Sequence, residues 1–484
     1  MPKGILPARK TKIVATIGPA SNSRETIARL IECGMDVARL NFSHGTHEEH
    51  SQVLRLIREE AERLDRHVAV FQDLCGPKVR IGELEGGEVL LSDGGTVCLR
   101  FADGSIGSAE RLYVEAFNPA MVMRPGEKAL LADGRIELQA VKVTVEEVEC
   151  VVKAGGRLRS RSGIAVPESK LELPCLTEKD KKDLVWAVEN DLDYIAISFV
   201  GSANDVFDLK RELDARGSSI PVIAKIERAS SLDHISAIVE AADAVMVARG
   251  DLGLELPLER VPSAQRLIIE TANFNGTPVI TATQMLMSMV KEIRPTRAEV
   301  SDVSTAVRDG TDAVMLSDET AIGSHPVEAV QVLSRIAQEA EKESHYERYK
   351  PRLKGSDREK VADAVCYAAV NAADKISASA VLACTQSGYS ARLMSKYRPQ
   401  QILFGATSER KALARMALYW GVEPLFIKLE DGSATEDEVS QSMITVREQY
   451  GIKPGSRVVV TAGLRAKKSG STSIMEIREI PRTR

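Results

Sequence analysis

Four short apolar runs between residues 221 and 320 each end in polar residues of the kind that carry out catalysis. The runs read PVIAKIE, AVMVARGD, PVITATQ and DAVMLSDE. Apolar runs without alternating polar positions are typical of parallel strands that are buried on both faces. Functional groups confined to the C-terminal ends of such strands are the arrangement of a TIM (β/α)8 barrel, whose active site lies at that rim. We therefore expect an α/β barrel with its site at the strand ends.

Eight runs of this kind predict eight barrel strands. They are 12–17, 36–41, 68–74, 193–199, 221–226, 244–248, 278–282 and 313–316. Amphipathic segments between them predict the crossover helices, and Thr177 followed by Asp180 marks one helix start. After Gly76 and Pro77 the helical pattern gives way to glycine-punctuated strands, from KVRIGEL to EEVECVVKAGG. The third barrel unit therefore carries an all-β insertion that can act as a lid.

The predicted order of domains follows from these patterns. The barrel occupies residues 1–77 and 167–350, the β lid residues 78–166, and a third domain residues 356–484. This last part alternates helices with strands near 380–384, 401–406, 424–428, 457–461 and 473–477, which predicts a small open α/β sheet.

Composition excludes several classes of function. A net charge of −5 and 4% aromatic residues offer neither a basic surface nor stacking platforms for nucleic acid. The seven cysteines form no CxxC pair, which indicates reduced, mostly buried thiols in a cytoplasmic protein. No run of about 18 apolar residues is present, so we expect no membrane span and no membrane partner.

Glu227 and Asp251 follow two successive predicted strands and form a candidate metal site. Carboxylate oxygens suit Mg²⁺ or Mn²⁺, with substrate and water oxygens completing the shell. Lys225 lies two residues before Glu227, so both side chains point to the same side of the strand. A salt bridge at the rim is the simpler interpretation of an isolated KxE. Its place beside ARGDLG on the next strand favours a site for an anionic group.

Two further strand ends carry polar clusters. RLNFSHG places Arg39, Asn41 and Ser43 on one alternating face, followed by His44. DLCGPKVR places Asp73, Lys78 and Arg80 where the chain leaves the barrel. Arginine suits phosphate, although the simpler interpretation of either arginine alone is a solvated or barrel-capping charge. The i, i+3, i+6 spacing of His44, His47 and His50 is not that of a zinc site, and we expect His47 and His50 on the surface.

Six motifs together resemble one family. RLNFSHGTH, GPKVR, IAKIE, VARGDLG, TATQML and MLSDETAIGSHPVEAV are similar to pyruvate kinase and occur in that family's order. The similarity continues through LPCLTEKD and the C-terminal TQSG and KYRP segments. It implies a glycolytic homotetramer that moves a phosphoryl group from phosphoenolpyruvate to ADP, with a barrel, a β lid and a regulatory C-terminal domain.

The resemblance also implies roles at the barrel. Lys225 would stabilise the phosphoryl group in flight, and Arg39 would contact it. Glu227 and Asp251 would hold the divalent metal. Thr283 would lie near the carbon that is protonated when enolpyruvate becomes pyruvate. The implied substrate-binding positions are Arg39, Lys225, Ala248, Arg249, Gly250, Asp251 and Thr283.

The nucleotide and the monovalent cation are implied to share one side of the site. The implied nucleotide-binding residues are Asn41, His44, Arg80 and Asp133. Many relatives bind K⁺ at the positions of Asn41, Ser43, Asp73 and Leu74. This chain has Lys78 where the family's DTKGPEIR has glutamate, and a fixed ammonium disfavours a second cation nearby. We therefore expect that K⁺ is not required; the alternative is that Lys78 is a solvated hinge residue.

Two parts of the resemblance are weaker. Asp133, in ADGRI, is either a lid aspartate that approaches the nucleotide or the first residue of an Asp-Gly hairpin turn. The C-terminal domain carries two stretches that resemble the family's sugar-phosphate effector site. Their candidate residues are Thr385, Ser387, Gly388, Ser390, Arg465, Lys467 and Gly470. The alternative is a capped helix beside a solvated basic loop.

Two other functions are compatible with parts of the chain. A metal-dependent barrel lyase or aldolase acting through a pyruvate enolate would use Lys225, Glu227 and Asp251 in a similar way. A catalytically inactive metabolite sensor would be expected to lose one of the three. The lid insertion and the GPKVR hinge favour the kinase over the lyase.

Overall fold

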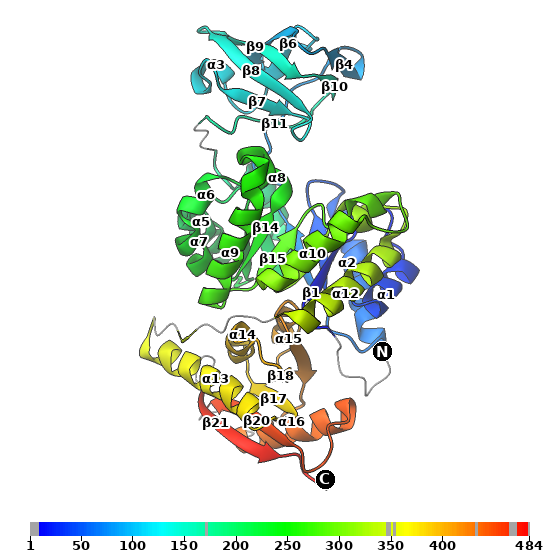
Figure 1. The fold of residues 1–484 in the computed structure, drawn as a ribbon, viewed down its shortest axis with the longest axis vertical. Coiled ribbons are helices and arrows are strands. Elements are labelled where there is room, and N and C mark those ends of the chain that lie inside the picture. Colours follow the sequence, from blue (N-terminus) through cyan, green and yellow to red (C-terminus); the bar gives the residue numbers. More distant parts are fainter. Residues whose placement is uncertain are drawn as a thin grey trace.

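The computed structural model describes residues 9–169, 173–344, 350–351, 355–430, 434–463 and 472–482. Three bodies follow one another along the longest axis of the molecule (Figure 1). A β-rich body lies at one end, the barrel in the middle and a smaller α/β body at the other end. None of the helices in the described ranges combines the length and the apolar character that a membrane crossing needs.

The middle body is a closed parallel barrel whose described strands run in the order β1-β16-β15-β14-β13-β12-β3-β2. These strands are β1 (Lys12–Thr16), β2 (Val37–Asn41), β3 (Ala69–Asp73), β12 (Tyr194–Ile197), β13 (Val222–Ile226), β14 (Ala244–Ala248), β15 (Val279–Ala282) and β16 (Ala313–Leu316). Each overlaps one predicted strand, and the predicted fold class is confirmed. Every residue of β1, β3, β12, β14, β15 and β16 is buried, which explains why the runs lack alternating polar positions.

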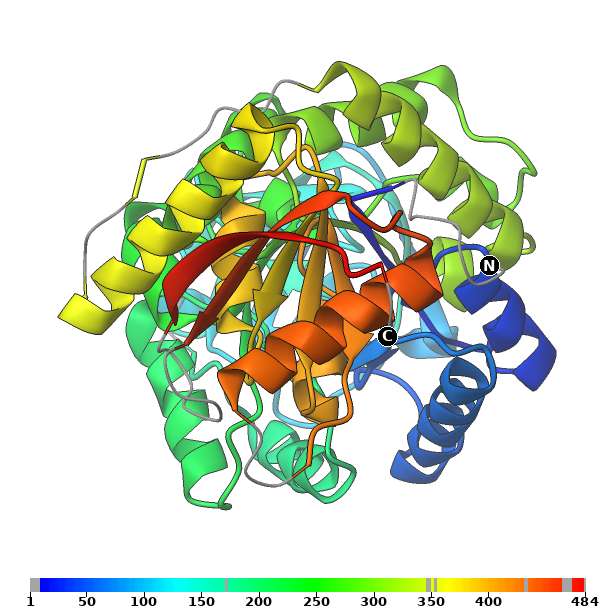
Figure 2. The ribbon, with the colours of Figure 1, turned by 90° about the horizontal axis from the view of Figure 1, so that it is seen from below.

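Helices surround the barrel (Figures 1 and 2). The longer ones are α1 (Arg24–Glu32), α2 (His47–Arg63), α4 (Glu178–Glu189), α5 (Ala203–Asp214), α7 (Ile235–Ala241), α9 (Val261–Asn275), α10 (Arg297–Asp309) and α12 (Pro326–Glu343). Shorter ones are α6 (Ser230–Asp233), α8 (Arg249–Glu255) and α11 (Asp318–Ala321). The predicted helix start at α4 is confirmed by a capping box. Thr177 accepts the Asp180 N–H at 3.1 Å, and the Asp180 carboxylate accepts the Thr177 N–H at 2.9 Å.

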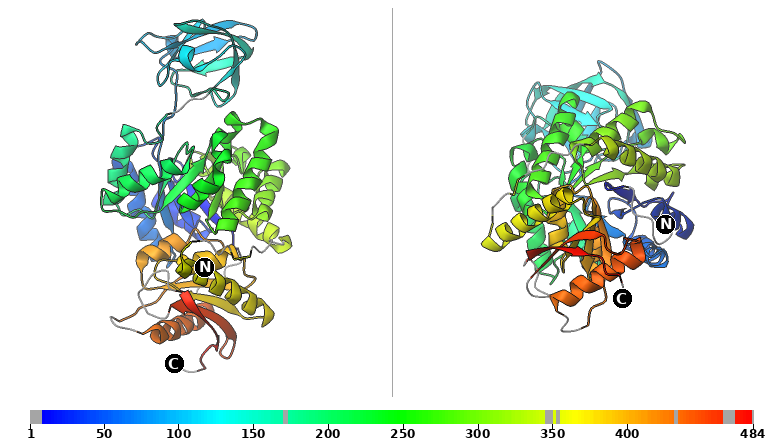
Figure 3. Two further views of the ribbon diagram at one scale, coloured as in Figure 1. Left: turned by 90° about the vertical axis from the view of Figure 1, so that its left-hand side faces the viewer. Right: turned by 60° about the horizontal axis from the view of Figure 1, so that its bottom comes forward.

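The lid is all-β apart from short helical turns, and Figure 3 shows the narrow connection that joins it to the barrel. Its elements are η1 (Glu85–Gly87), β4 (Glu88–Leu91), β5 (Thr96–Phe101), β6 (Arg111–Val114), α3 (Pro119–Val122), β7 (Lys128–Leu131), β8 (Ile136–Val143), β9 (Glu147–Ala154), β10 (Gly156–Arg159) and β11 (Ile164–Ala165). Its main described sheet has the order β11-β7-β8-β9-β5-β6. It encloses an apolar core of its own, separate from that of the barrel.

The predicted strand KVRIGEL is wrong. Instead of joining one ladder, this segment makes isolated bridges to three different partners, in which Arg80 pairs with Gly163, Ile81 with Val114 and Leu84 with Gly107. A segment that changes partner every few residues cannot extend a strand, although its apolar residues still point into the lid core.

The C-terminal body is the predicted open sheet, with strand order β19-β18-β17-β20-β21 and only β21 antiparallel among the described strands. Its elements are α13 (Asp357–Lys375), β17 (Ala380–Cys384), α14 (Tyr389–Lys396), β18 (Ile402–Thr407), α15 (Arg410–Met416), β19 (Val422–Phe426), α16 (Thr435–Tyr450), β20 (Arg457–Gly463) and β21 (Thr472–Glu479). Its α14 and α15 share one apolar cluster with barrel residues such as Phe71 and Tyr194. The Tyr194 hydroxyl also donates to the Arg415 carbonyl at 2.9 Å, so this body closes the N-terminal end of the barrel.

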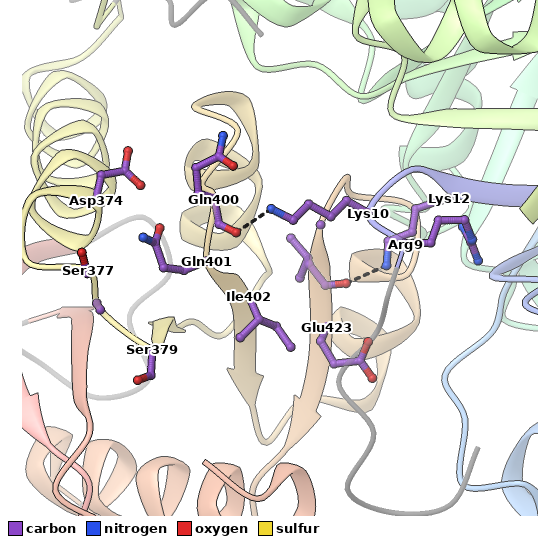
Figure 4. Close-up of a pocket in the computed structure, with 13 residues that line it drawn as sticks. Arg9, Lys10, Lys12, Asp374, Ser377, Ser379, Gln400, Gln401, Ile402 and Glu423 are labelled. Carbon is purple, nitrogen blue, oxygen red and sulfur yellow. Dashed lines mark hydrogen bonds between the residues drawn. The ribbon is translucent and has the colours of Figure 1, made fainter. Parts of the chain in front are cut away.

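Lysine side chains cross the boundary between the barrel and the C-terminal body, beside a cavity of about 740 Å³ (Figure 4). Lys10 Nζ donates to the Pro399 and Gln400 carbonyls at 2.7 and 2.8 Å, and Lys12 Nζ donates to the Val422 carbonyl at 2.7 Å. Burial lowers the pKa of Lys12 below its ordinary value. The bodies are therefore joined by polar contacts as well as by apolar packing.

The expectation that His50 lies on the surface is wrong. Its ring is buried and stacks on Phe42, with 4.1 Å between the ring centroids, and Nε2 donates to the His44 carbonyl at 2.9 Å. His47 is half-buried, with Nε2 2.8 Å from an Asp183 carboxylate oxygen. Both rings pack beside Trp186 and hold the loop between β2 and α2.

Burial lowers the pKa of His50 below 6.5, its ordinary value. Between the folded and unfolded pKa values the folded state therefore binds fewer protons, and stability falls as the pH drops from about 6.5 through the lower, folded-state pKa. His50→Gln removes this titration, so its stability should depend less on pH. Urea unfolding from about pH 7.5 to about pH 5 measures the difference. The exposed His234, changed to Gln, is the control; equal pH slopes for His50→Gln and wild type would contradict the expectation.

Candidate active site

Strands β2, β3, β13 and β14 bring the predicted charged residues to one place, with β12 lying between β3 and β13. In the barrel order β14-β13-β12-β3-β2, Arg39 lies on β2, Asp73 ends β3, and Lys225 lies near the end of β13 with Glu227 following it. Asp251 lies in the first turn of α8, directly after β14. The C-terminal ends of neighbouring parallel strands thus supply every member of the cluster.

Lys225 stands at the centre of this cluster. Its Nζ lies 3.0 Å from Asp73 Oδ1 and 3.0 Å from Glu227 Oε1, and donates to Ser198 Oγ at 2.7 Å. Burial lowers the pKa of Lys225, but the charges of Asp73 and Glu227 outweigh burial and raise the pKa overall. The ammonium is therefore fixed and charged at neutral pH.

Asp73 joins the two cations of the site. Its side chain is 1% exposed, and Oδ2 accepts from Arg39 Nε at 2.7 Å. Burial tends to raise the pKa of Asp73, but Lys225 and Arg39 outweigh that effect and lower it. Arg39 Nη1 also donates to Thr16 Oγ1 at 3.1 Å, which fixes the guanidinium on a second side. Asp73, expected near a monovalent cation, is here the counter-ion of Arg39 and Lys225.

Glu227 and Asp251 fit a divalent cation by the chemistry of their oxygens. Glu227 is 1% exposed, and its Oε2 accepts the Phe199 N–H at 2.7 Å. Burial raises the pKa of Glu227; Lys225 opposes this rise and the Asp251 carboxylate adds to it. A bound dication would stabilise the charged form of Glu227 and so oppose the rise in its pKa. Within the described ranges no group of three His, Cys, Asp or Glu side chains could hold a metal ion, so a cation at Glu227 and Asp251 would take its other ligands from substrate and water.

The Arg249 guanidinium faces away from this cluster toward the protein. Its Nη1 lies 2.7 Å from Asp302 Oδ2, and Nη2 donates to the Thr283 carbonyl at 2.6 Å. The Gly250 N–H donates to Thr283 Oγ1 at 2.8 Å. Thr283 and Gln284 have φ values of +70° and +54°, a conformation that non-glycine residues rarely adopt. Arg249 thus braces a strained loop, and the backbone at Ala248–Gly250 is the part that can meet a ligand.

The predicted nucleotide and cation residues are divided between barrel and lid. Asn41 Oδ1 accepts the Ser43 N–H at 3.2 Å, and the His44 side chain is exposed beside them. Arg80 Nη1 donates to the Arg161 carbonyl at 2.8 Å in the lid connection, where Lys78 is exposed. Leu74 is buried next to Asp73.

Asp133 lies in the β7–β8 turn of the lid and is 73% exposed. Its φ of +57° and the following Gly134 agree with the hairpin-turn interpretation. A Cβ at Gly134 would lie 2.8 Å from Leu254 Cδ2, so this turn packs against α8, the helix that carries Asp251.

The candidate effector residues that the structure describes are already engaged. Thr385 Oγ1 accepts the Gly388 N–H at 3.1 Å, and Gly388, with φ +82°, precedes α14. Ser390 is buried and its hydroxyl pairs with that of Thr472. Ser387 lies in the same turn, while Arg465, Lys467 and Gly470 lie outside the described residues.

Ser198 and Phe199, which contact Lys225 and Glu227, were not predicted as site residues. Their signal is the same as that of the predicted residues, because they directly follow the barrel strand β12. Asp302 was missed because it lies inside helix α10, where no strand-end rule applies.

The chain is similar to known proteins over most of its length. Residues 8–330 match the family described as "Pyruvate kinase, barrel domain", and residues 363–478 match "Pyruvate kinase, alpha/beta domain". A pyruvate kinase of Clostridium acetobutylicum is 37% identical over 473 residues, which cover 98% of this chain and 100% of that protein. One of Geobacillus stearothermophilus is 42% identical over 479 residues, covering 98% and 80%.

A solved structure has the same fold. The crystal structure of a pyruvate kinase from Cryptosporidium parvum superposes with a TM-score of 0.90 at 35% sequence identity, covering 98% of this chain and 97% of that one. The family match, the full-length relatives and this superposition all extend over the barrel and the C-terminal body. The chain belongs to the pyruvate kinase family.

Proposed function

We propose that the charge cluster at the barrel mouth transfers the phosphoryl group of phosphoenolpyruvate to ADP and so forms pyruvate and ATP in glycolysis. The observation that carries the proposal is the Lys225 ammonium, held between Asp73 and Glu227 at the barrel mouth. In phosphoryl transfer the protein contributes little covalent chemistry, and catalysis depends on positioning the reactants and neutralising their charge. A cluster of fixed cations and carboxylates provides both.

Arg39 and Lys225 would face the transferring group from one side. Both cations are already oriented by Asp73, so little reorganisation is needed when charge moves between oxygens. Glu227 and Asp251 would hold Mg²⁺ or Mn²⁺. When bound, that cation would supply positive charge next to the phosphoryl and carboxylate oxygens of the substrate.

Thr283 would lie beside the enol carbon, with the substrate carboxylate at the backbone of Ala248–Gly250. The short contact between the Gly250 N–H and Thr283 Oγ1 keeps these two subsites next to each other. Asn41, His44, Arg80 and Asp133 would serve the nucleotide, from the barrel and from the lid. The contact of the lid turn with α8 supports a site shared by the two bodies.

A lyase or aldolase that forms a pyruvate enolate would use the same lysine and carboxylates. Strict dependence of pyruvate formation on ADP separates the kinase from this alternative. An inactive sensor is disfavoured because Lys225, Glu227 and Asp251 are all present and the first two are in contact.

The family resemblance further implies a cytoplasmic homotetramer that responds to a phosphorylated effector. We therefore propose that the enzyme depends on Mg²⁺ or Mn²⁺, does not require K⁺, forms a tetramer and is controlled through the turn at Thr385–Gly388.

Lys225→Met should lower kcat by roughly 10²–10³-fold, because the transferring group loses a preorganised cation. Pyruvate formation from phosphoenolpyruvate and ADP, coupled to a reporter reaction, measures the loss. Lys411, an exposed lysine that pairs with Asp191, provides the control Lys411→Met, which should leave kcat unchanged. Full turnover by Lys225→Met, or pyruvate formation without ADP, would refute the assignment.

Rates in Na⁺ and K⁺ buffers of equal ionic strength should agree within about twofold if the Lys78 ammonium replaces the monovalent cation. Lys78→Glu restores the carboxylate common in the family, and this variant should be stimulated by K⁺. Lys142→Glu makes the same change of charge near the C-terminal end of β8, where Lys142 is exposed, and serves as the control that should not respond to K⁺. A tenfold loss of wild-type rate in Na⁺ would contradict the expectation.

A phosphorylated effector should raise the thermal unfolding midpoint by about 2 °C or more at saturating concentration, since ligands that bind only the folded state stabilise it. The panel comprises fructose 1,6-bisphosphate, a sugar monophosphate and AMP, with inorganic phosphate as the control. No response to any of the three would remove the effector site from the proposal.

A further inference from the structure

Ser198 directly follows β12 and touches both the active site and the start of the lid connection. Its Oγ accepts from Lys225 Nζ at 2.7 Å and lies 2.8 Å from the Leu74 carbonyl. An ammonium can only donate, so the single hydroxyl proton goes to Leu74. The residue is 1% exposed. The direction of both hydrogen bonds is thereby determined.

Phe199, the next residue, holds the other end of the Lys225–Glu227 pair. Its N–H donates to Glu227 Oε2 at 2.7 Å, and its φ is +58°. A strained backbone conformation of this kind persists only where surrounding contacts enforce it. Here Cys175 donates through Sγ to the Phe199 carbonyl at 3.1 Å. The Ser198–Phe199 pair therefore orients a candidate catalytic lysine and a candidate metal ligand together.

Gly76 lies against the same pair. A Cβ at this position would be 2.8 Å from Ser198 Cβ and 3.1 Å from Phe199 Cδ2, and φ is +65°. Both the space and the backbone conformation require glycine here. The segment that leaves the barrel for the lid thus packs directly on the residues that position Lys225.

We propose that Ser198 is a positioning residue for phosphoryl transfer, acting through Lys225. The ammonium donates a hydrogen bond to Ser198 Oγ at 2.7 Å and forms ion pairs with Asp73 and Glu227, each at 3.0 Å. This inference rests on the proposed function, in which Glu227 turns its oxygens to a metal. Asp73 and Ser198 are then the partners that keep the lysine in place, and Ser198 alone does so without adding negative charge.

Ser198→Ala should lower kcat by about tenfold or more, the cost of one hydrogen bond to a charged group. The KM for phosphoenolpyruvate and the dissociation constant for Mn²⁺, followed by electron paramagnetic resonance, should stay within about twofold. Metal affinity is retained because Glu227 keeps its bond to the Phe199 N–H. A merely structural residue would instead move all three quantities together or none.

Ser231 provides the matched control. It is buried in the same region and its hydroxyl donates to the Val200 carbonyl at 2.6 Å, two residues beyond Ser198, without contacting the charge cluster. Ser231→Ala should keep the wild-type kcat. Ser198→Cys, which preserves volume but accepts hydrogen bonds poorly, should show the kcat defect even if the alanine variant does not fold.

Wild-type kcat in the Ser198 variants would overturn the inference, as would an equal loss in Ser231→Ala or a parallel loss of Mn²⁺ affinity. A wild-type enzyme that forms no pyruvate would instead overturn the proposed function, so the two failures are distinguishable.

Discussion

The charge cluster centred on Lys225 is the constraint on which the rest of the site depends. Asp73 and Glu227 are each 1% exposed, and the Lys225 side chain is 11% exposed. Removing ions from water costs several kcal/mol each, and the cost is recovered only when every charge has a close partner. Arg39 and Lys225 neutralise the two carboxylates, so the cluster is stable only as a unit. Strands β2, β3, β12 and β13 must therefore keep their register, since a one-residue slip would point these side chains away.

Residues on β1 and in the loops after β15 and β16 hold this cluster in place. The Thr16 hydroxyl on β1 accepts a hydrogen bond from Arg39 and donates one to the Leu316 carbonyl at 2.8 Å. The buried Glu319 accepts N–H groups of Leu286 at 3.0 Å and Ser317 at 2.8 Å, which ties the loops after β15 and β16 together. These contacts carry no chemistry of their own. They hold the backbone so that Thr283 and Arg39 keep their positions.

How far the sequence predicts this site depends on which physical rule applies. Lys225 and Glu227 are predictable because residues two apart share one side of a strand, and barrel strands present function at their C-terminal ends. Ser198 obeys the same rule, yet its role appears only when β12 is placed beside β13, with Ala196 opposite Ile223. His50 was misjudged because helical spacing alone cannot reveal that Phe42 stacks on its ring.

In the lid, the sequence predicted the all-β insertion but not how its segments pair. Glycine-punctuated runs predicted strands throughout the insertion, but the segment before η1 contributes Val79, Ile81 and Leu84 to the lid core without joining a ladder. Periodicity reports which side chains are buried and does not report hydrogen-bond partners. The order of the domains was accessible from the break in helical pattern after Gly76, whereas the pairing inside the insertion was not.

The segment from Leu74 to Gly76 connects the barrel to the lid and lies next to the active site. The lid touches the barrel at Leu254 of α8 through Gly134, and the chain leaves the barrel for the lid at Gly76, which lies against Ser198 and Phe199. Ser198 bonds Lys225 on one side and Leu74 on the other, so movement of the connection would reach the ammonium through one hydroxyl group. Because protein interiors are close-packed, a larger side chain at Gly76 would press directly on Ser198 and Phe199.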